Sequence, residues 1–154
     1  MLFVLFRAGP TRYALAASSV VEVVPLVRLE PLPGAPASVR GLFSYRGTPV
    51  PAVDVSVLTG AGPAPDRMST RIVIVSWAED DGTARLAGLI ATSVTETVDR
   101  SADDPPPSGL ALPSAPWIAS AFIVGGEVVP CVRVEAFLPA EVRALVDQSA
   151  GGRA

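Results

Sequence analysis

Histidine, lysine and asparagine are all absent from this chain of 154 residues, and Cys131 is its single cysteine. Without histidine, the chain lacks the commonest general base near neutral pH and the commonest protein ligand of metals. Without lysine, it can form no Schiff base and offers no lysine of the P-loop type. One cysteine makes neither an internal disulfide nor a zinc or iron–sulfur site. These absences exclude most enzyme classes and predict a protein without a metal or cofactor.

Charged and aromatic residues are also scarce, at 18% and 6% of the chain. All 12 basic residues are arginine, the formal net charge is −3, and the pI is about 4.9. Nucleic-acid binding needs a positive surface, and single-strand binding needs stacking aromatic side chains, so the sequence argues against both. No apolar run reaches the roughly 18 residues of a membrane-spanning helix, and the opening run is too short for a signal-peptide core. We therefore expect a cytoplasmic protein that does not insert into membranes.

What the sequence does contain is a series of short apolar runs separated by proline, glycine or aspartate. Its 16 prolines and 13 glycines are too many for a helical bundle. About ten short strands spaced 8–12 residues apart predict an all-β sandwich or barrel. The candidate strands are residues 2–7, 12–15, 20–29, 39–45, 48–55, 71–77, 85–91, 93–98, 118–124 and 127–132.

Three other segments complete the predicted organisation. Residues 60–65, rich in glycine and proline, are a candidate hinge between two lobes. Residues 101–113 are too rich in proline for a central strand and predict an extended loop. Pro139 stands where a first-turn proline would, so we expect a short helix over about residues 140–148, followed by a frayed tail at 150–154.

The most informative segment, residues 33–54, is typical of a proline-stiffened loop, a strand, a tight Arg-Gly turn and a return strand. Gly41 and Gly47 are positions where the backbone can need a positive φ or a close approach. Pro51 interrupts the second strand and indicates an edge or a bulge. Asp54 stands at the strand end, where its carboxylate can accept backbone N–H bonds. On residue types alone, the segment is an ordinary hairpin with solvated arginines.

The same segment resembles the signature of the CheW family, the adaptor of bacterial chemotaxis-type signalling. The family's core is P-x-x-(v)-x-G-(v)-x-N-(l)-R-G-x-x-(v)-P-(v)-(v)-D, and residues 36–54 follow it closely. Other parts of the chain resemble the family's opening strands, its V-x-E-(v/i) element, its G-(l)-(v)-V-D-x-V strand and its closing L-(l)-D-(v)-x-x-L-L. These matches lie at residues 3–7, 13–15, 20–24, 72–75, 88–94 and 128–138, so the resemblance covers residues 2–146.

The resemblance implies a specific all-β architecture. Two small five-stranded SH3-like barrels would pack side by side, with the short helix over about residues 139–149 at the C-terminal end. A single CheW-like domain would occupy residues 1–150. One barrel would take most of residues 12–60 and the other most of residues 68–138. Whether residues 2–7 pack with the second barrel stays open.

The resemblance also implies a function, that of a non-catalytic adaptor recruited to membrane receptor arrays. Its partners would be the cytoplasmic tip of a chemoreceptor and the regulatory domain of a CheA-type histidine kinase. An amphipathic receptor helix could lay its apolar face in a groove between the barrels. The receptor-binding residues carried over by position are Ala17, Val20, Glu22, Gly41, Arg46 and Gly88. We expect Gly47, Pro51 and Asp54 to be structural, and no residue to be catalytic or metal-binding.

The chain departs from the family pattern at three polar positions. Ser44 stands where the family usually has asparagine, and it cannot copy a two-headed amide. Thr92 stands where an aspartate usually lies, and Arg133 reverses the charge of another. These changes predict a specialised paralogue with altered partners, and the opening residues most resemble adaptors of Wsp-type surface-sensing systems.

Two other function classes remain as alternatives. A small-molecule-binding β-barrel module would need a pocket with convergent polar groups, and few polar residues have a buried pattern. A carboxylate-based enzyme could pair Glu22 with Asp54, but a glycosidase of that kind needs an aromatic-lined sugar cleft. The nine aromatic residues of the chain are too few to favour that second alternative.

Overall fold

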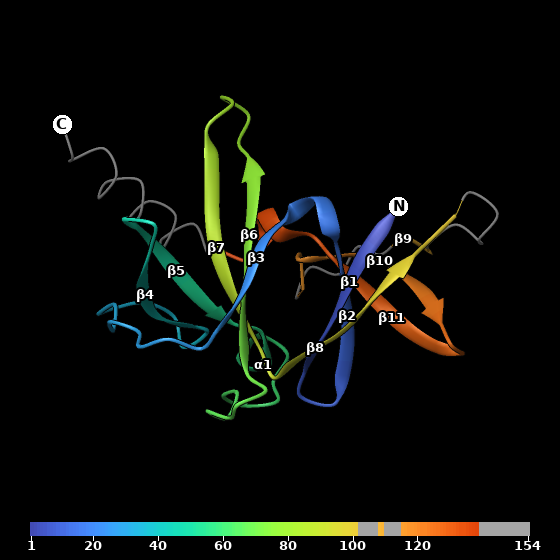
Figure 1. Ribbon diagram of the computed structural model, residues 1–154, viewed down its shortest axis with the longest axis horizontal. Helices are drawn as coiled ribbons and strands as arrows, with labels where there is room; N and C mark the ends of the chain where they lie inside the picture. The colour runs from blue at the N-terminus through green and yellow to red at the C-terminus, as the bar shows by residue number, and fades with distance from the viewer. Residues whose placement is uncertain (102–107, 110–114, 139–154) are drawn as a thin grey trace.

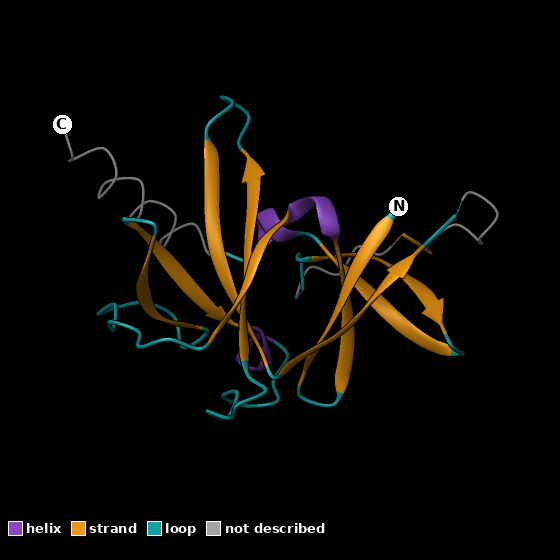
Figure 2. Ribbon diagram, in the orientation of Figure 1, coloured by secondary structure: helices purple, strands orange, loops and turns teal. Residues whose placement is uncertain are grey.

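Strands form almost all of the regular structure in this computed structural model, which describes residues 1–101, 108–109 and 115–138. Figure 1 shows two curled sheets side by side, and Figure 2 shows how little helix accompanies them. The short helical turns are η1 (Ala17–Ser19), α1 (Val55–Leu58) and η2 (Val134–Ala136). None of the helices formed by the described residues has the length and apolarity needed to cross a bilayer. The prediction of an all-β fold with two small barrels is confirmed.

One sheet, here called the six-stranded barrel, has the strand order β8-β1-β2-β11-β10-β9. Its strands are β1 (Leu2–Ala8), β2 (Thr11–Ala16), β8 (Ser93–Asp99), β9 (Ser108–Gly109), β10 (Ile118–Val124) and β11 (Glu127–Val132). The other, the five-stranded barrel, has the order β3-β6-β7-β5-β4. Its strands are β3 (Val20–Pro25), β4 (Val39–Tyr45), β5 (Thr48–Asp54), β6 (Arg71–Ala78) and β7 (Ala84–Ala91). The terminal helix predicted over residues 140–148 lies outside the described residues.

The strands are divided between the barrels differently from the predicted 12–60 and 68–138 lobes. β6 and β7 belong with β3, β4 and β5, whereas β2 joins the C-terminal strands. The reason is that β5 pairs parallel with β7, and β11 parallel with β2, and parallel neighbours require crossover connections. The chain changes sheet at η1 and at Thr92, so residues 60–65 join two strands of one barrel and are not a hinge between lobes. Residues 2–7 pack in the barrel that holds β10 and β11.

The two barrels follow one plan, with strands exchanged between the halves of the chain. β3 leaves the β1–β2 hairpin to pair with β6, and β8 leaves the β6–β7 hairpin to pair with β1. The registers agree in detail, because each crossing strand carries a bulge immediately before a glutamate, between Val20 and Glu22 and between Val94 and Glu96. The sequence repeats as well: residues 19–24 are SVVEVV and residues 93–98 are SVTETV. Each barrel is therefore completed by a two-stranded hairpin from the other half of the chain: β6–β7 in one and β1–β2 in the other.

Three apolar clusters hold this arrangement together. The largest lies between the sheets and contains residues of both, among them Phe6, Leu15, Val73, Leu89, Trp117 and Phe137. The five-stranded barrel encloses Phe43, Val50, Ala52, Ala64, Ile72, Ile74 and Ile90. The six-stranded barrel encloses Leu5, Ala14, Phe122 and Val129. Because the largest cluster belongs to neither barrel alone, the two barrels are expected to unfold together.

Candidate partner-binding surface

The β4–β5 turn presents the arginine that the signature singles out. Tyr45 and Thr48 are paired across the hairpin, and the two turn residues between them, Arg46 and Gly47, have φ values of 51° and 80°. Positive φ at both central positions is the geometry of a type I′ turn, which matches the twist of a hairpin. Arg46 is the one described residue other than glycine with positive φ, and its side chain is 75% exposed. The turn therefore projects a guanidinium into solvent.

Glu22 connects this turn to β3, the strand at the other edge of the sheet order. The Tyr45 hydroxyl donates a hydrogen bond of 2.5 Å to Glu22 Oε2, and Arg46 Nη2 lies 3.5 Å from the same oxygen. The Arg46 guanidinium also stands over the Tyr45 ring, 5.1 Å from its centroid. The hydrogen bond to the Glu22 carboxylate raises the pKa of Tyr45, so the phenol stays protonated and keeps donating. These three side chains form a polar cluster, the Glu22–Arg46 cluster.

The cluster helps to close the five-stranded barrel. β3 and β4 are the two end strands of the sheet order, and an isolated bridge between Glu30 and Leu42 joins the segment after β3 to β4 through two backbone bonds of 2.8 Å. Val21 and Val23, on either side of Glu22, are 43% and 40% exposed. The sequence did not indicate that these two valines are exposed. Their exposure follows from the position of β3 at the edge of the sheet order. The surface thus combines apolar side chains with a charged centre.

Ala17 and Val20 lie where the chain crosses between the barrels. Ala17 belongs to η1, and Val20 begins β3 and packs against the central cluster. Both are half-buried, which leaves part of each side chain at the surface. They share β3 and the turn before it with Glu22, so the structure brings four of the six predicted receptor-binding residues to one region.

The other two, Gly41 and Gly88, are buried inside the five-stranded barrel, and their place in the receptor-binding groove stays a prediction. A Cβ on Gly88 would lie 2.7 Å from Ile72 Cγ2 and 2.8 Å from Phe43 Cε1. Gly41 has a φ of 149°, and its Cβ would run into the carbonyl oxygen of Glu30. Both glycines let neighbouring chain segments approach inside the five-stranded barrel.

Asp54 is fully buried at the end of β5 and has both carboxylate oxygens in use. Oδ1 accepts from the Ser56 N–H at 3.0 Å, which caps α1, and Oδ2 accepts from the Ala64 N–H at 2.9 Å. Arg40 Nη1 lies 3.3 Å from Oδ2. Glu22, in contrast, is exposed and bonded to Tyr45. The geometry gives Asp54 a structural role and does not favour pairing these two carboxylates for hydrolysis.

Pro51 is buried within β5, which is an interior strand of the sheet, so the edge expected there is only local. It pairs with Leu42 on one side, while the ladder to β7 begins one residue later at Ala52. Pro51 therefore lies before the first β5–β7 pair, and its missing N–H removes no hydrogen bond from that ladder. The bulge of this hairpin lies on β4, between Val39 and Gly41.

The three departures from the family pattern have different surroundings. Ser44 is exposed on β4, opposite Pro49. Thr92 marks a crossing between barrels, where its N–H and its hydroxyl both donate to the carbonyl of Arg7, at 2.9 and 3.0 Å. Arg133 is half-exposed and lies 3.7 Å from Glu135. Thr92 thus anchors the crossing to β1, a role its place in the sequence did not indicate.

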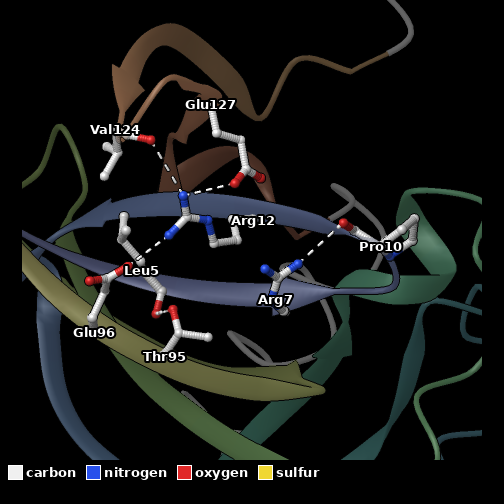
Figure 3. A network of polar contacts seen from close by, with 8 residues as sticks. All are labelled: Leu5, Arg7, Pro10, Arg12, Thr95, Glu96, Val124 and Glu127. Atoms are coloured by element: carbon white, nitrogen blue, oxygen red, sulfur yellow. Dashed lines mark hydrogen bonds and ion pairs between the residues drawn. The ribbon is translucent and has the colours of Figure 1, made fainter.

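Arg12 is a second polar centre that sequence reasoning missed, on β2 of the six-stranded barrel (Figure 3). Its Nη1 donates to Glu96 Oε1 at 2.7 Å, and its Nη2 to Glu127 Oε2 at 2.8 Å and to the carbonyl of Val124 at 3.5 Å. Its side chain is only 12% exposed. Glu96 occupies the position on β8 that Glu22 occupies on β3. The repeated S-V-x-E-x-V pattern is therefore the sequence signal from which this second polar centre could have been predicted.

Replacing Arg12 by alanine is expected to lower the free energy of unfolding by about 1–2 kcal/mol. The substitution removes three hydrogen bonds and leaves Glu96 and Glu127 near each other without their shared cation. Urea unfolding measures the effect, with Arg133→Ala as the matched control because Arg133 has one loose ion pair. Equal midpoints for the two variants would show that the Arg12 contacts contribute no net stability.

Cys131 is half-buried on β11, and burial raises the pKa of its thiol against the smaller lowering effects of Ser120 and Arg100. A raised pKa keeps the thiol protonated, and only the thiolate reacts. Iodoacetamide at pH 8 is therefore expected to modify native Cys131 roughly tenfold more slowly than the urea-unfolded chain. Equal rates in mass spectrometry would contradict this. Among the described residues, no three His, Cys, Asp or Glu side chains come together to hold a metal.

Comparison with known proteins agrees with this geometry. The family model of the CheW-like domain matches residues 2–142. A chemotaxis protein CheW from Rhizobium meliloti (strain 1021) is 26% identical over 149 residues, covering 91% of this chain and 88% of that protein. The scaffolding protein TtCheW from Thermoanaerobacter tengcongensis shares the fold, with a TM-score of 0.70 and 24% identity over 86% of this chain and 84% of that one. Because the family model spans nearly all of it, this chain belongs to the CheW-like domain family.

Proposed function

We propose that this chain is a non-catalytic adaptor of chemotaxis-type signalling, which couples the cytoplasmic tip of a chemoreceptor to the regulatory domain of a CheA-type histidine kinase. Its membership of the CheW-like family supports the proposal, as do the relatives described as a chemotaxis protein and a scaffolding protein. The adaptor would work in the cytoplasm, at arrays of membrane receptors. The observation that carries the proposal furthest is the exposed Glu22–Arg46 cluster.

The chemistry of this surface suits a helix with one apolar face and an acidic border. The guanidinium of Arg46 offers a planar fork to a partner carboxylate, and the exposed Val21 and Val23, which flank Glu22 on β3, offer apolar contact. Ala17 and Val20 extend the surface toward the crossing between the barrels. Gly41 and Gly88 act indirectly, since they allow the barrel that carries the cluster to pack.

The cluster is also able to release Arg46 to a partner. The Arg46–Glu22 ion pair is long, at 3.5 Å, and its side chains are 75% and 43% exposed. Exposed pairs of this kind contribute little stability, so exchanging Glu22 for a partner's carboxylate costs little. The Tyr45 hydroxyl remains as a donor for Glu22 after the exchange. Binding therefore leaves no carboxylate of the cluster without a hydrogen bond.

Arg46→Ala is expected to weaken binding of a receptor cytoplasmic fragment by about 1–3 kcal/mol without changing the fold. Arg46→Glu is expected to weaken it further, because it places like charges against an acidic partner. Isothermal titration of the cognate receptor fragment measures both effects, with thermal melts of each variant. Co-purification with the kinase and the receptor tests whether one chain holds both partners.

Arg133→Ala serves as the control, since Arg133 is an exposed arginine on the other barrel. If Arg46→Ala and Arg46→Glu both bind as tightly as the unchanged protein, Arg46 does not belong to the site. If their melting transitions collapse instead, the residue is structural.

A further inference from the structure

Two shallow cavities lie next to each other on the five-stranded barrel. A cavity of about 440 Å³ lies between the end of β3 and the loop before β6, and one of about 330 Å³ lies along residues 26–29. Leu26 and Asp66 line both cavities, so the two are adjacent. We call this depression the arginine groove, after its lining residues Arg28, Arg40, Arg67 and Arg71.

The charge of this groove differs from that of the whole chain. Four arginines line it, whereas Asp66 is the one acidic residue among the described residues that do so. Glu30 lies 3.9 Å from Arg28, but both side chains are largely exposed and the pair is weak. Asp54, which pairs with Arg40, is fully buried behind it. A ligand in the groove therefore meets mainly guanidinium groups.

Two of the four arginines are already held in place. Arg40 Nη1 lies 3.3 Å from both Asp54 Oδ2 and the carbonyl of Ala64. Arg71 Nη1 donates to the carbonyl of Met68 and, at 3.0 Å, to that of Thr70. Fixed donors lose little conformational entropy when a ligand binds. The Arg67 guanidinium makes no hydrogen bond or ion pair with the part of the chain that the structure describes, so it is available to an anion.

Apolar side chains accompany these charges. Met68 is 93% exposed at one cavity, and Val27 is 43% exposed at the other. A small inorganic anion would gain nothing from either side chain, and it would be too small to reach both cavities. An extended peptide with both acidic and apolar residues complements a lining of arginines and apolar side chains, as acidic motifs bind arginine clusters elsewhere.

We propose that the arginine groove binds an acidic peptide segment of a protein partner, with carboxylates on Arg67 and Arg28 and apolar side chains on Met68 and Leu26. The groove is separate from the Glu22–Arg46 cluster. Figure 1 shows the loop before β6 at the lower end of the molecule and the β4–β5 turn at its upper left. One barrel would therefore carry two surfaces for acidic partners.

The test is fluorescence anisotropy of the full chain with a labelled peptide of about 12 residues that alternates glutamate and leucine. A matched peptide of glutamine and leucine separates charge from apolar contact. We expect the glutamate peptide to bind at about 20 mM NaCl and to weaken at about 300 mM, where screening is stronger. Arg28→Ala/Arg67→Ala should weaken binding roughly tenfold, whereas Arg67→Lys should retain most of it. Neither substituted side chain holds another element in place, so melting temperatures should not change.

Arg133→Ala is the control and should bind the glutamate peptide as the unchanged protein does, whereas Arg46→Ala measures any binding of the peptide at the Glu22–Arg46 cluster. If Arg46→Ala weakens binding while Arg28→Ala/Arg67→Ala leaves it unchanged, the peptide uses the other surface and the proposal fails. It also fails if the glutamine peptide binds equally well, or if no binding is measured at low salt. Displacement by pyrophosphate at concentrations equal to those of the glutamate peptide would show a small-anion site instead.

Discussion

Asp54→Ala is expected to lower the free energy of unfolding by about 3–5 kcal/mol, enough to unfold a substantial fraction of molecules at 37 °C. The carboxylate is fully buried and serves three partners: the Ser56 N–H, the Ala64 N–H and Arg40. Its removal deprives α1 of a cap and leaves a buried donor at Ala64 without its acceptor. Arg40 loses its counter-charge as well. Urea unfolding followed by circular dichroism gives the midpoint for each variant.

Asp54→Asn is the graded control for this result. The amide keeps the size of the side chain and one accepting oxygen, but its NH₂ group would face either the Ser56 N–H or both the Ala64 N–H and Arg40, all of which are donors. We expect an intermediate loss. If Asp54→Ala costs less than about 1 kcal/mol, the three contacts have been replaced by water, and the structural role of this residue is wrong.

Gly88→Val is the second large effect, with an expected loss of about 3 kcal/mol or more. The first added carbon would already lie 2.7 Å from Ile72 Cγ2 and 2.8 Å from Phe43 Cε1, inside an apolar cluster with no free space on that side. β7 would have to move away from β6 or from the Phe43 ring. Gly88→Ala should cause a smaller loss of the same sign.

Ala84→Val is the matched control, because Ala84 is exposed on the same strand and the same two methyl groups would meet solvent. It should leave the unfolding midpoint almost unchanged. The comparison also separates packing from recognition. If Gly88 acts only through packing, Gly88→Ala binds a receptor fragment normally once the folded fraction is accounted for. Reduced affinity of fully folded Gly88→Ala would return this glycine to the binding site.

Local features of the fold could be predicted from the sequence because they depend on neighbours in the chain. The Arg46-Gly47 dipeptide between apolar runs specified a hairpin turn, and the strands at residues 39–45, 118–124 and 127–132 have the expected bounds. The candidate strand at 20–29 ends earlier, at Pro25. Alternation of apolar residues tells which face of a strand is buried, but not which strand lies beside it.

The partners of the strands could not be predicted for that reason. The parallel pairs Ala52–Gly88 and Cys131–Ala14 join segments far apart in the chain. The residue pattern of one segment does not indicate which other segment pairs with it. Arg12 was missed for a related reason: an arginine beside a turn looks solvated until Glu96 and Glu127 arrive from other strands. Gly88 was assigned to the receptor-binding groove by resemblance alone. A match of sequence positions does not tell whether the matched residue is buried.

The exchange of β3 and β8 between the halves of the chain has a practical consequence for cutting the molecule. Cleavage within residues 60–65 would give one fragment with β1–β5 and another that begins just before β6. Neither fragment could assemble a barrel, because each crossing strand would lack the hairpin it pairs with. Mixed together, the fragments would restore both barrels in one step. The domain is therefore suited to split-protein reporters, in which two inactive pieces report the proximity of whatever they are fused to.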